Sequence, residues 1–136
     1  MNSIDHRELN RRLDLYSTSE AVGPGLILWH PHGAMLRHLA ERFSRDAHLL
    51  NGYELVATPH VGKAKLWKTS GHLEHYADSM FRPMEVEGER YYVKPMNCPF
   101  HIEIFKSRPR SYRDLPKRYA EFGTVYRYEL SGVLQG

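Results

Sequence analysis

The sequence contains one cysteine, Cys98, and no long apolar run. A single cysteine excludes an intramolecular disulfide and favours a reducing compartment, so we expect a cytoplasmic protein. No apolar stretch approaches the ~20 residues of a membrane-spanning helix. The first residues are polar and charged, unlike a signal peptide. We therefore expect no membrane association.

The sequence also lacks internal repeats, low-complexity tracts and a strong charge bias. Its 19 basic and 16 acidic side chains leave a net charge of +3. This mild excess permits an anionic partner, such as a nucleotide or RNA, without identifying one. The length of 136 residues corresponds to about one domain with a real core.

Apolar spacing predicts the elements of the first half. A short charged helix over residues 5–16 is followed by a short buried strand over 26–29 and a turn over 30–33. The clearest helix covers residues 34–50, because its apolar residues recur at spacings of three and four. These apolar residues are Met35, Leu36, Leu39, Phe43, Ala47 and Leu50. A strand over 53–58 then ends at Pro59.

The second half is predicted to alternate short helices and strands. We expect helices over residues 61–69 and 98–107, a helical turn near 114–116, and a turn at 87–89. Strands are expected over 90–96 and 118–129, with Gly123 marking a bulge or a close backbone approach. The fold class is therefore α+β, with a mostly antiparallel sheet flanked by helices.

Cys98 lies where a predicted strand gives way to a predicted helix. It belongs to the run Lys94, Pro95, Met96, Asn97, Cys98 and Pro99. Free cysteine is among the most buried residue types, so a packing role is the default interpretation. A nucleophile and a metal ligand are the alternatives.

Arg127 and Glu129 end the last predicted strand, where alternation puts both on one face and Tyr128 on the other. Such a pair is usually a surface ion pair of little energetic value, which spacing alone favours. The functional alternative is an arginine fork that binds a phosphate, next to a carboxylate that accepts from an amino group.

Several of these stretches, in order along nearly the whole chain, resemble threonyl-tRNA synthetases, which are class II aminoacyl-tRNA synthetases. Residues 34–59 resemble motif 1 of that class, and residues 118–136 resemble the start of motif 2. The Met-Asn-Cys-Pro run and the following Ser-Tyr-Arg-Asp-Leu-Pro run at 111–116 resemble the threonyl family specifically. The resemblance implies a charged helical lead-in over 1–20 and an incomplete class II catalytic domain over 21–136.

The resemblance also implies roles for individual residues. Arg127 would hold the ATP α-phosphate and stabilise charge during attack by the threonine carboxylate, and Glu129 would accept from the adenine amino group. Met96 would line the amino-acid pocket. Cys98 would be a ligand of a Zn²⁺ ion that binds threonine and rejects valine. The implied substrates are threonine, ATP with Mg²⁺ and tRNA(Thr), and motif 1 implies a homodimer.

This chain departs from the family pattern at several points. The family's other zinc ligands are histidines beyond motif 2, and no histidine follows His101 here. Leu130 and Gln135 stand where Arg and His are expected, and the sequence ends within the motif 2 loop. We therefore expect a threonine–tRNA ligase fragment that is inactive alone. The alternatives are another class II synthetase, of prolyl or seryl type, and a non-catalytic synthetase-like binding fragment.

Overall fold

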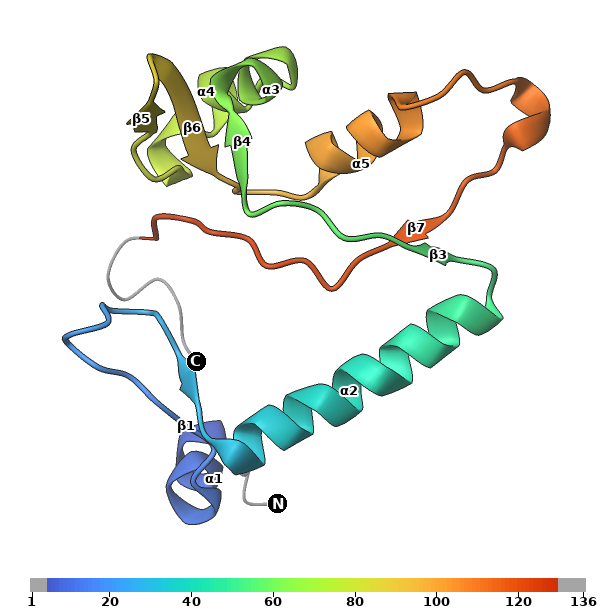
Figure 1. Ribbon diagram of the computed structural model, residues 1–136. Helices are drawn as coiled ribbons and strands as arrows, with labels where there is room; N and C mark the ends of the chain where they lie inside the picture. Colours follow the sequence, from blue (N-terminus) through green and yellow to red (C-terminus); the bar gives the residue numbers. More distant parts are fainter. Residues whose placement is uncertain (1–4, 130–136) are drawn as a thin grey trace. The chain divides into compact units, whose positions relative to one another are not determined.

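The computed structural model describes residues 5–129. The chain divides after Leu50 into two compact units, which are described separately below: unit 1 extends to Leu50, and unit 2 begins at Asn51. Figure 1 shows their helices and strands along the chain. Within the described range, no helix has both the length and the apolar character needed to cross a membrane.

Unit 1 consists of two helices and a small antiparallel pair of strands. Its elements are α1 (His6–Leu13), β1 (Tyr16–Ser17), β2 (Leu28–Trp29) and α2 (Pro31–Leu50). The side chain of Asp5 caps α1 by accepting from the Arg7 backbone N–H at 2.8 Å. Both predicted helices are confirmed. The strand predicted over residues 26–29 is shorter and exposed, with Trp29 44% accessible.

Helix α2 begins at Pro31, so the turn predicted over residues 30–33 is wrong. Proline suits the first turn of a helix, because the N–H that it lacks would have no partner there. Gly33 lies so close to Leu15 that a Cβ would overlap the Leu15 carbonyl oxygen. The ring of His30 contacts Asp14 Oδ1 at 2.7 Å and Ser17 Oγ at 2.9 Å. These contacts fix the start of α2 against β1.

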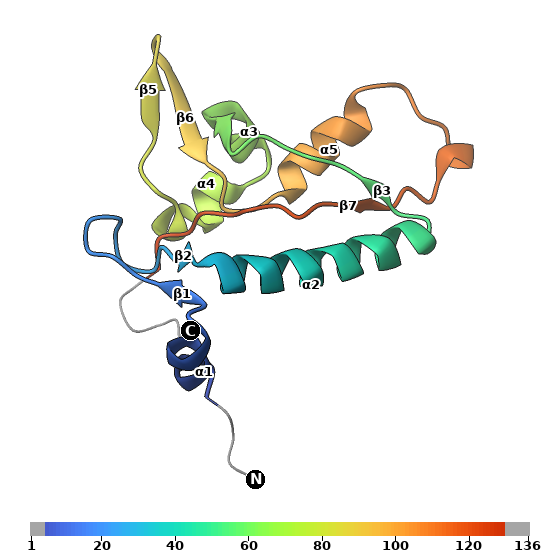
Figure 2. The same cartoon turned by 60° about the horizontal axis from the view of Figure 1, so that its bottom comes forward.

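Unit 2 holds the remaining elements, in two separate sheets. Its helices are α3 (Ala64–Thr69), α4 (His72–His75), η1 (Ala77–Ser79), α5 (Cys98–Lys106) and η2 (Tyr112–Asp114). Its strands are β3 (Glu54–Leu55), β4 (Val61–Lys63), β5 (Met84–Val86), β6 (Glu89–Val93) and β7 (Tyr119–Ala120). The larger sheet has the order β4-β6-β5 and is antiparallel. Figure 2 shows the β5–β6 hairpin from a second side.

The larger sheet confirms one local prediction and corrects another. Glu87 and Gly88 both have positive φ, 52° and 79°, and form the predicted turn between β5 and β6. The helix predicted over residues 61–69 begins only at Ala64, because Val61–Lys63 pairs with β6 instead. Gly62 lets the Phe100 ring pack against this strand, since a Cβ there would come within 2.9 Å of the ring.

Aromatic packing forms the core of unit 2. Trp67 is completely buried and meets the rings of Phe100 and His72 edge-on, with centroids 5.5 and 5.7 Å apart. Its indole N–H donates to the Gly62 carbonyl at 3.1 Å. This bond satisfies the polar atom that burial of a tryptophan would otherwise leave unpaired.

The smaller sheet pairs β3 with β7 in parallel, which the sequence did not predict. The strands that were expected over residues 53–58 and 118–129 are regular only over these two-residue segments. The remainder of 121–129 runs without a strand ladder as far as the structure describes it. The α+β class with mostly antiparallel pairing is confirmed, with β3–β7 as the parallel exception.

Replacing Gly33 with alanine should destabilise unit 1. Alanine in a helix is normally favoured over glycine by about 1 kcal/mol. Here the added methyl meets a backbone carbonyl, and such overpacking costs about 1–3 kcal/mol. We expect Gly33→Ala to lower the midpoint of thermal unfolding followed by far-ultraviolet circular dichroism. His38→Ala, at an exposed position of α2, is the control; a higher midpoint for Gly33→Ala would contradict the close contact.

Candidate functional site

The candidate site is built on the turn between β6 and α5. We call residues 94–98 the 94–98 turn. The side chains of Lys94 and Pro95 are almost completely buried, whereas Cys98 is exposed at the first position of α5. Pro99 follows within the first turn of that helix and is buried. The packing interpretation of Cys98 is therefore wrong, and the thiol is accessible to a ligand.

Met96 contacts a histidine that sequence reasoning did not single out. His72 Nε2 lies 3.2 Å from Met96 Sδ, and His72 Nδ1 lies 2.8 Å from Ser70 Oγ. His72 is buried against Trp67. In the sequence, His72 is marked only by the Ser-Gly-His turn at residues 70–72. Its contact with Met96 depends on how α3 and α4 pack against the 94–98 turn.

Arg127 joins the same turn from a distant part of the chain. We call residues 121–127 the 121–127 segment. Arg127 Nε donates to the Pro95 carbonyl at 3.1 Å, and the Tyr126 N–H donates to the Lys94 carbonyl at 2.8 Å. The Arg127 side chain is therefore bonded to the residue that precedes Met96, within the turn that also carries Cys98.

Glu129 is exposed two residues beyond Arg127. No ion pair joins Arg127 to Glu129 within the described residues, so the surface pair that spacing favoured is wrong. The backbone between them is anchored instead, since the Tyr128 N–H donates to the Ser79 carbonyl at 2.9 Å. The Tyr128 ring meets the Phe81 ring edge-on at 6.3 Å. Leu130 and Gln135, where the family pattern is broken, lie outside the described residues.

Gly123 makes the close backbone approach that the sequence predicted. A Cβ at this position would overlap the side-chain amide of Asn97. The Asn97 side chain thus lies directly on the backbone of the 121–127 segment. Its Oδ1 is buried without a hydrogen-bond partner among the described residues. The 94–98 turn therefore contacts the 121–127 segment at Gly123 as well as at Tyr126 and Arg127.

A buried polar cluster beneath these segments was not predicted. We call Thr58, Lys94, His101 and Glu121 the Glu121 cluster. Thr58 donates to Glu121 Oε1 through its N–H at 2.7 Å and its hydroxyl at 2.9 Å. His101 Nε2 lies 2.8 Å from Glu121 Oε2. Lys94 Nζ donates to Thr58 Oγ1 at 3.0 Å and lies 3.9 Å from Glu121 Oε1.

Two opposing effects act on the pKa of Glu121. Burial is the larger single effect and raises the pKa, because it disfavours the charged form. Hydrogen bonds from His101 and Thr58, together with the Lys94 charge, act in the opposite direction and outweigh it. The pKa of Glu121 is therefore lowered from the ordinary value, and Glu121 is ionised at neutral pH.

The described residues do not complete a zinc site around Cys98. No group of three His, Cys, Asp or Glu side chains that could hold a metal ion occurs within residues 5–129. His72 and His101, which flank the 94–98 turn, contact Met96 and Glu121. A catalytic zinc ion needs about three protein ligands, so one thiolate does not fit the group by itself.

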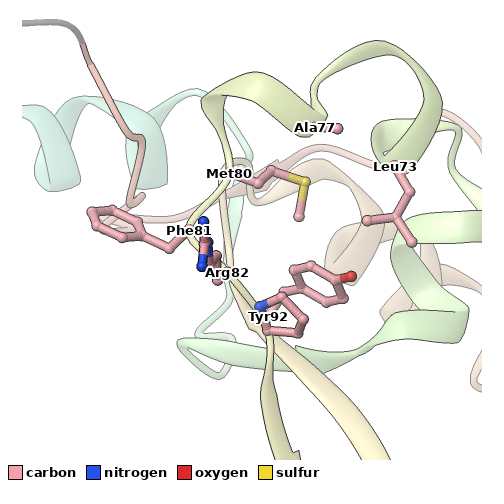
Figure 3. A pocket seen from close by; sticks show the side chains of 7 residues that line it. Leu73, Ala77, Met80, Phe81, Arg82 and Tyr92 are labelled. Atoms are coloured by element: carbon pink, nitrogen blue, oxygen red, sulfur yellow. The ribbon is translucent and has the colours of Figure 1, made fainter.

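The pocket in Figure 3 is a different feature from this site. Its volume is about 310 Å³. Its lining comes from α4, η1, the loop before β5, and β6: Leu73, Ala77, Met80, Phe81, Arg82, Pro83 and Tyr92. The side chains of Leu73, Met80 and Tyr92 face one another, and Phe81 points away from them. None of the predicted site residues lines this largely apolar pocket.

Acid should weaken unit 2 through Glu121. A carboxyl whose pKa is lowered by folding stabilises the folded state above its ordinary pKa of 4.5, and this contribution is lost as the pH falls through the folded-state value. The expected result is a urea midpoint that decreases below about pH 4.5, measured by Trp67 fluorescence in a Trp29→Phe background. Glu121→Gln should flatten this decrease, while Glu85→Gln on exposed β5 should not. Parallel curves for all three proteins would refute the role of Glu121.

Comparison with known proteins gives close relatives for nearly the whole chain. Threonine–tRNA ligases of Borrelia turicatae and Aquifex aeolicus are each 60% identical over 132 residues, which is 97% of this chain. The chain spans only 23% and 21% of those two relatives. A family model described as the tRNA synthetase class II core domain (G, H, P, S and T) matches residues 81–136.

Solved structures agree with the sequence matches. A structure titled as the RNA binding domain of threonyl-tRNA synthetase from Cryptosporidium parvum superposes with a TM-score of 0.91 at 41% identity, covering 98% of this chain and 33% of that one. A prolyl-tRNA synthetase of Giardia lamblia, 21% identical with a TM-score of 0.78, covers 93% of this chain and 26% of that one and shows the fold alone. The chain is therefore similar to threonyl-tRNA synthetases over nearly its whole length, and residues 81–136 match the class II core of tRNA synthetases.

Proposed function

We propose that this chain is the part of a threonine–tRNA ligase that binds ATP and threonine for the activation of threonine. The observation that carries the proposal is the bond from Arg127 Nε to the Pro95 carbonyl. It brings the proposed phosphate-binding side chain to the turn that carries Met96 and Cys98. The whole enzyme would join threonine to ATP with release of pyrophosphate, and would then transfer the threonyl group to tRNA(Thr) in the cytoplasm.

Arg127 would act on the α-phosphate of ATP bound with Mg²⁺. Its Nε donates to Pro95, and neither Nη group makes a hydrogen bond or ion pair with another of the described residues, so the outer edge of the guanidinium would be available to a phosphate. As the threonine carboxylate attacks, negative charge increases on the phosphoryl oxygens, and a fixed guanidinium stabilises it. Glu129 would accept from the adenine amino group, and Met96 would contact the bound amino acid.

Cys98 would supply one thiolate to a zinc ion that discriminates threonine from valine. Exposure of the thiol at the start of α5 supports this role. A hydrophobic pocket separates such isosteric side chains only weakly, so a metal that binds the hydroxyl would add selectivity. Because residues 5–129 supply no complete ligand set, we propose no role for zinc in this chain beyond that one ligand.

We also propose that α2 pairs with a second copy of the chain. The apolar residues predicted to share one face of α2 are exposed: Met35, Leu36, Leu39, Phe43 and Leu50. Phe43 is 77% accessible, and Leu50 is 86% accessible. A contiguous apolar stripe of this length on a helix marks an interaction surface. A second copy presents the same stripe, as a two-fold interface requires.

A chimera tests the proposed activity. The 132 matching residues of the Aquifex aeolicus enzyme would be replaced by this chain, and threonine-dependent ATP–pyrophosphate exchange would be measured. We expect exchange in the chimera, a loss of about 100-fold or more in Arg127→Ala, and no detectable threonine-dependent exchange in Cys98→Ser. Glu103→Gln on the exposed side of α5 is the control for substitution in this region. The 136-residue chain alone should show no exchange.

An inactive chimera that folds as well as its parent would refute the proposed function. An active chimera in which Cys98→Ser exchanges as fast as the control would instead remove the zinc-ligand role. Such a result would favour a class II enzyme that does not use this thiol.

Charge on the apolar face of α2 should prevent dimer formation. Phe43→Glu introduces a carboxylate at the centre of the exposed stripe, where pairing would bury it at a cost of several kcal/mol, roughly. We expect sedimentation equilibrium to show a dimer for the parent chimera and a monomer for Phe43→Glu. His38→Glu adds the same charge on another face of α2 and should stay dimeric. A dimer that survives Phe43→Glu would contradict pairing through this face.

A further inference from the structure

Lys94 contacts the 121–127 segment through both its backbone and its side chain. Its carbonyl accepts from the Tyr126 N–H at 2.8 Å, and its ammonium lies 3.9 Å from Glu121 Oε1. The next carbonyl, that of Pro95, accepts from Arg127 Nε. Asn97 meets Gly123 between these points. The 94–98 turn therefore holds both ends of the segment that carries Arg127.

The environment of Lys94 is unusual for a lysine. Its side chain is 1% accessible, whereas lysine is almost never fully buried unless it is paired. The ammonium donates to Thr58 Oγ1 at 3.0 Å, the Thr58 hydroxyl donates to Glu121, and the Phe100 ring lies 5.8 Å away. The ammonium attracts Glu121 directly across 3.9 Å, while the Thr58 hydroxyl bridges the two groups by hydrogen bonds, since 3.9 Å is too long for a direct one.

Stability alone is a poor explanation for this arrangement. Desolvation of two charges commonly costs as much as their attraction returns, and an apolar replacement of a buried pair is often neutral or stabilising. Hydrogen bonds are directional, whereas apolar contacts are not. A hydrogen-bonded lysine, threonine and glutamate therefore fix the relative register of three segments, which apolar contacts would allow to shift.

We propose that Lys94 is a positioning residue for Arg127. Its side chain fixes Glu121, its carbonyl fixes Tyr126, and together they hold the guanidinium of Arg127 beside the 94–98 turn. The inference rests on the proposed function, because it assigns Lys94 an effect on the step at which Arg127 stabilises the phosphoryl charge. Displacement of a catalytic group by about 1 Å can cost about 100-fold in rate.

The test separates positioning from stability by using two variants in the chimera. Lys94→Met alone removes the ammonium that faces the buried Glu121 carboxylate and leaves it only the Thr58 and His101 contacts, so the melting temperature should fall by about 5 °C or more. Lys94→Met combined with Glu121→Gln removes both charges and should recover most of that loss. The double variant should nevertheless keep an exchange kcat at least about 10-fold below the parent chimera.

An exposed ion pair of the same unit provides the matched control. Lys117 Nζ and Glu54 Oε1 are 2.6 Å apart beside the β3–β7 pair. Lys117→Met combined with Glu54→Gln removes a lysine–glutamate pair that lies away from the 94–98 turn, and its exchange kcat should stay close to that of the parent chimera. Recovery of kcat together with the melting temperature in the Lys94 double variant would reduce Lys94 to a structural residue.

A measurement that does not depend on catalysis tests the positioning role of Lys94 separately from the proposed ligase function. In the 136-residue chain, the Nε–H signal of Arg127 can be followed by nuclear magnetic resonance and assigned with Arg127→Lys. This proton is hydrogen-bonded to the Pro95 carbonyl, and the positioning role predicts that the bond opens more often in the Lys94 double variant. Its exchange with solvent should therefore be at least about 10-fold slower in the parent than in that variant. Equal exchange rates would overturn the positioning role. An inactive chimera with unequal rates would overturn the proposed function alone.

Discussion

One buried carboxylate, that of Glu121, fixes the relative placement of the segments of unit 2. It accepts from Thr58, faces Lys94 and contacts His101, so residues that follow β3, β6 and β7 meet one another and α5 at a single group. Among the described residues, Trp67 and Met80 are the buried large hydrophobic side chains. An unpaired buried polar group costs about 1–3 kcal/mol, so a shift of any one segment is penalised directly. The register of unit 2 is therefore set largely by polar groups that must be satisfied.

The 121–127 segment runs beside the 94–98 turn without forming a strand, and the residues of the two segments explain why. Pro95 has no N–H and cannot extend the ladder beyond the bond from Tyr126 to the Lys94 carbonyl. The next attachment is made by a side chain instead, through Arg127 Nε. Gly123 lets the backbone come close enough for the Asn97 amide to lie against it. Because backbone pairing stops at Pro95, the next bond is made by the Arg127 side chain, which places its guanidinium at the 94–98 turn.

The sequence predicted what depends on neighbouring residues and failed where distant segments meet. The α2 stripe and the Glu-Gly turn at 87–88 follow from local spacing and backbone preference, as does the close approach at Gly123. Residues 61–63 carry no local mark of a strand, because their state is decided by pairing with β6. His72 and the Glu121 cluster become recognisable only when several elements converge. Resemblance to a family supplied roles for Met96, Cys98, Arg127 and Glu129 that spacing could not.

In the proposed function, Arg127 would combine a structural bond with a contact to phosphate, which a lysine could not do. Its Nε–H donates to the Pro95 carbonyl, while the Nη groups have no hydrogen bond to another of the described residues and would be left to bind a phosphate. The guanidinium is planar, so fixing Nε also fixes the direction in which the outer N–H groups point. A lysine would have to choose between the carbonyl and the phosphate, because its ammonium is one point charge on a flexible chain. The structural bond would therefore orient the guanidinium for the proposed catalytic contact in advance of substrate binding.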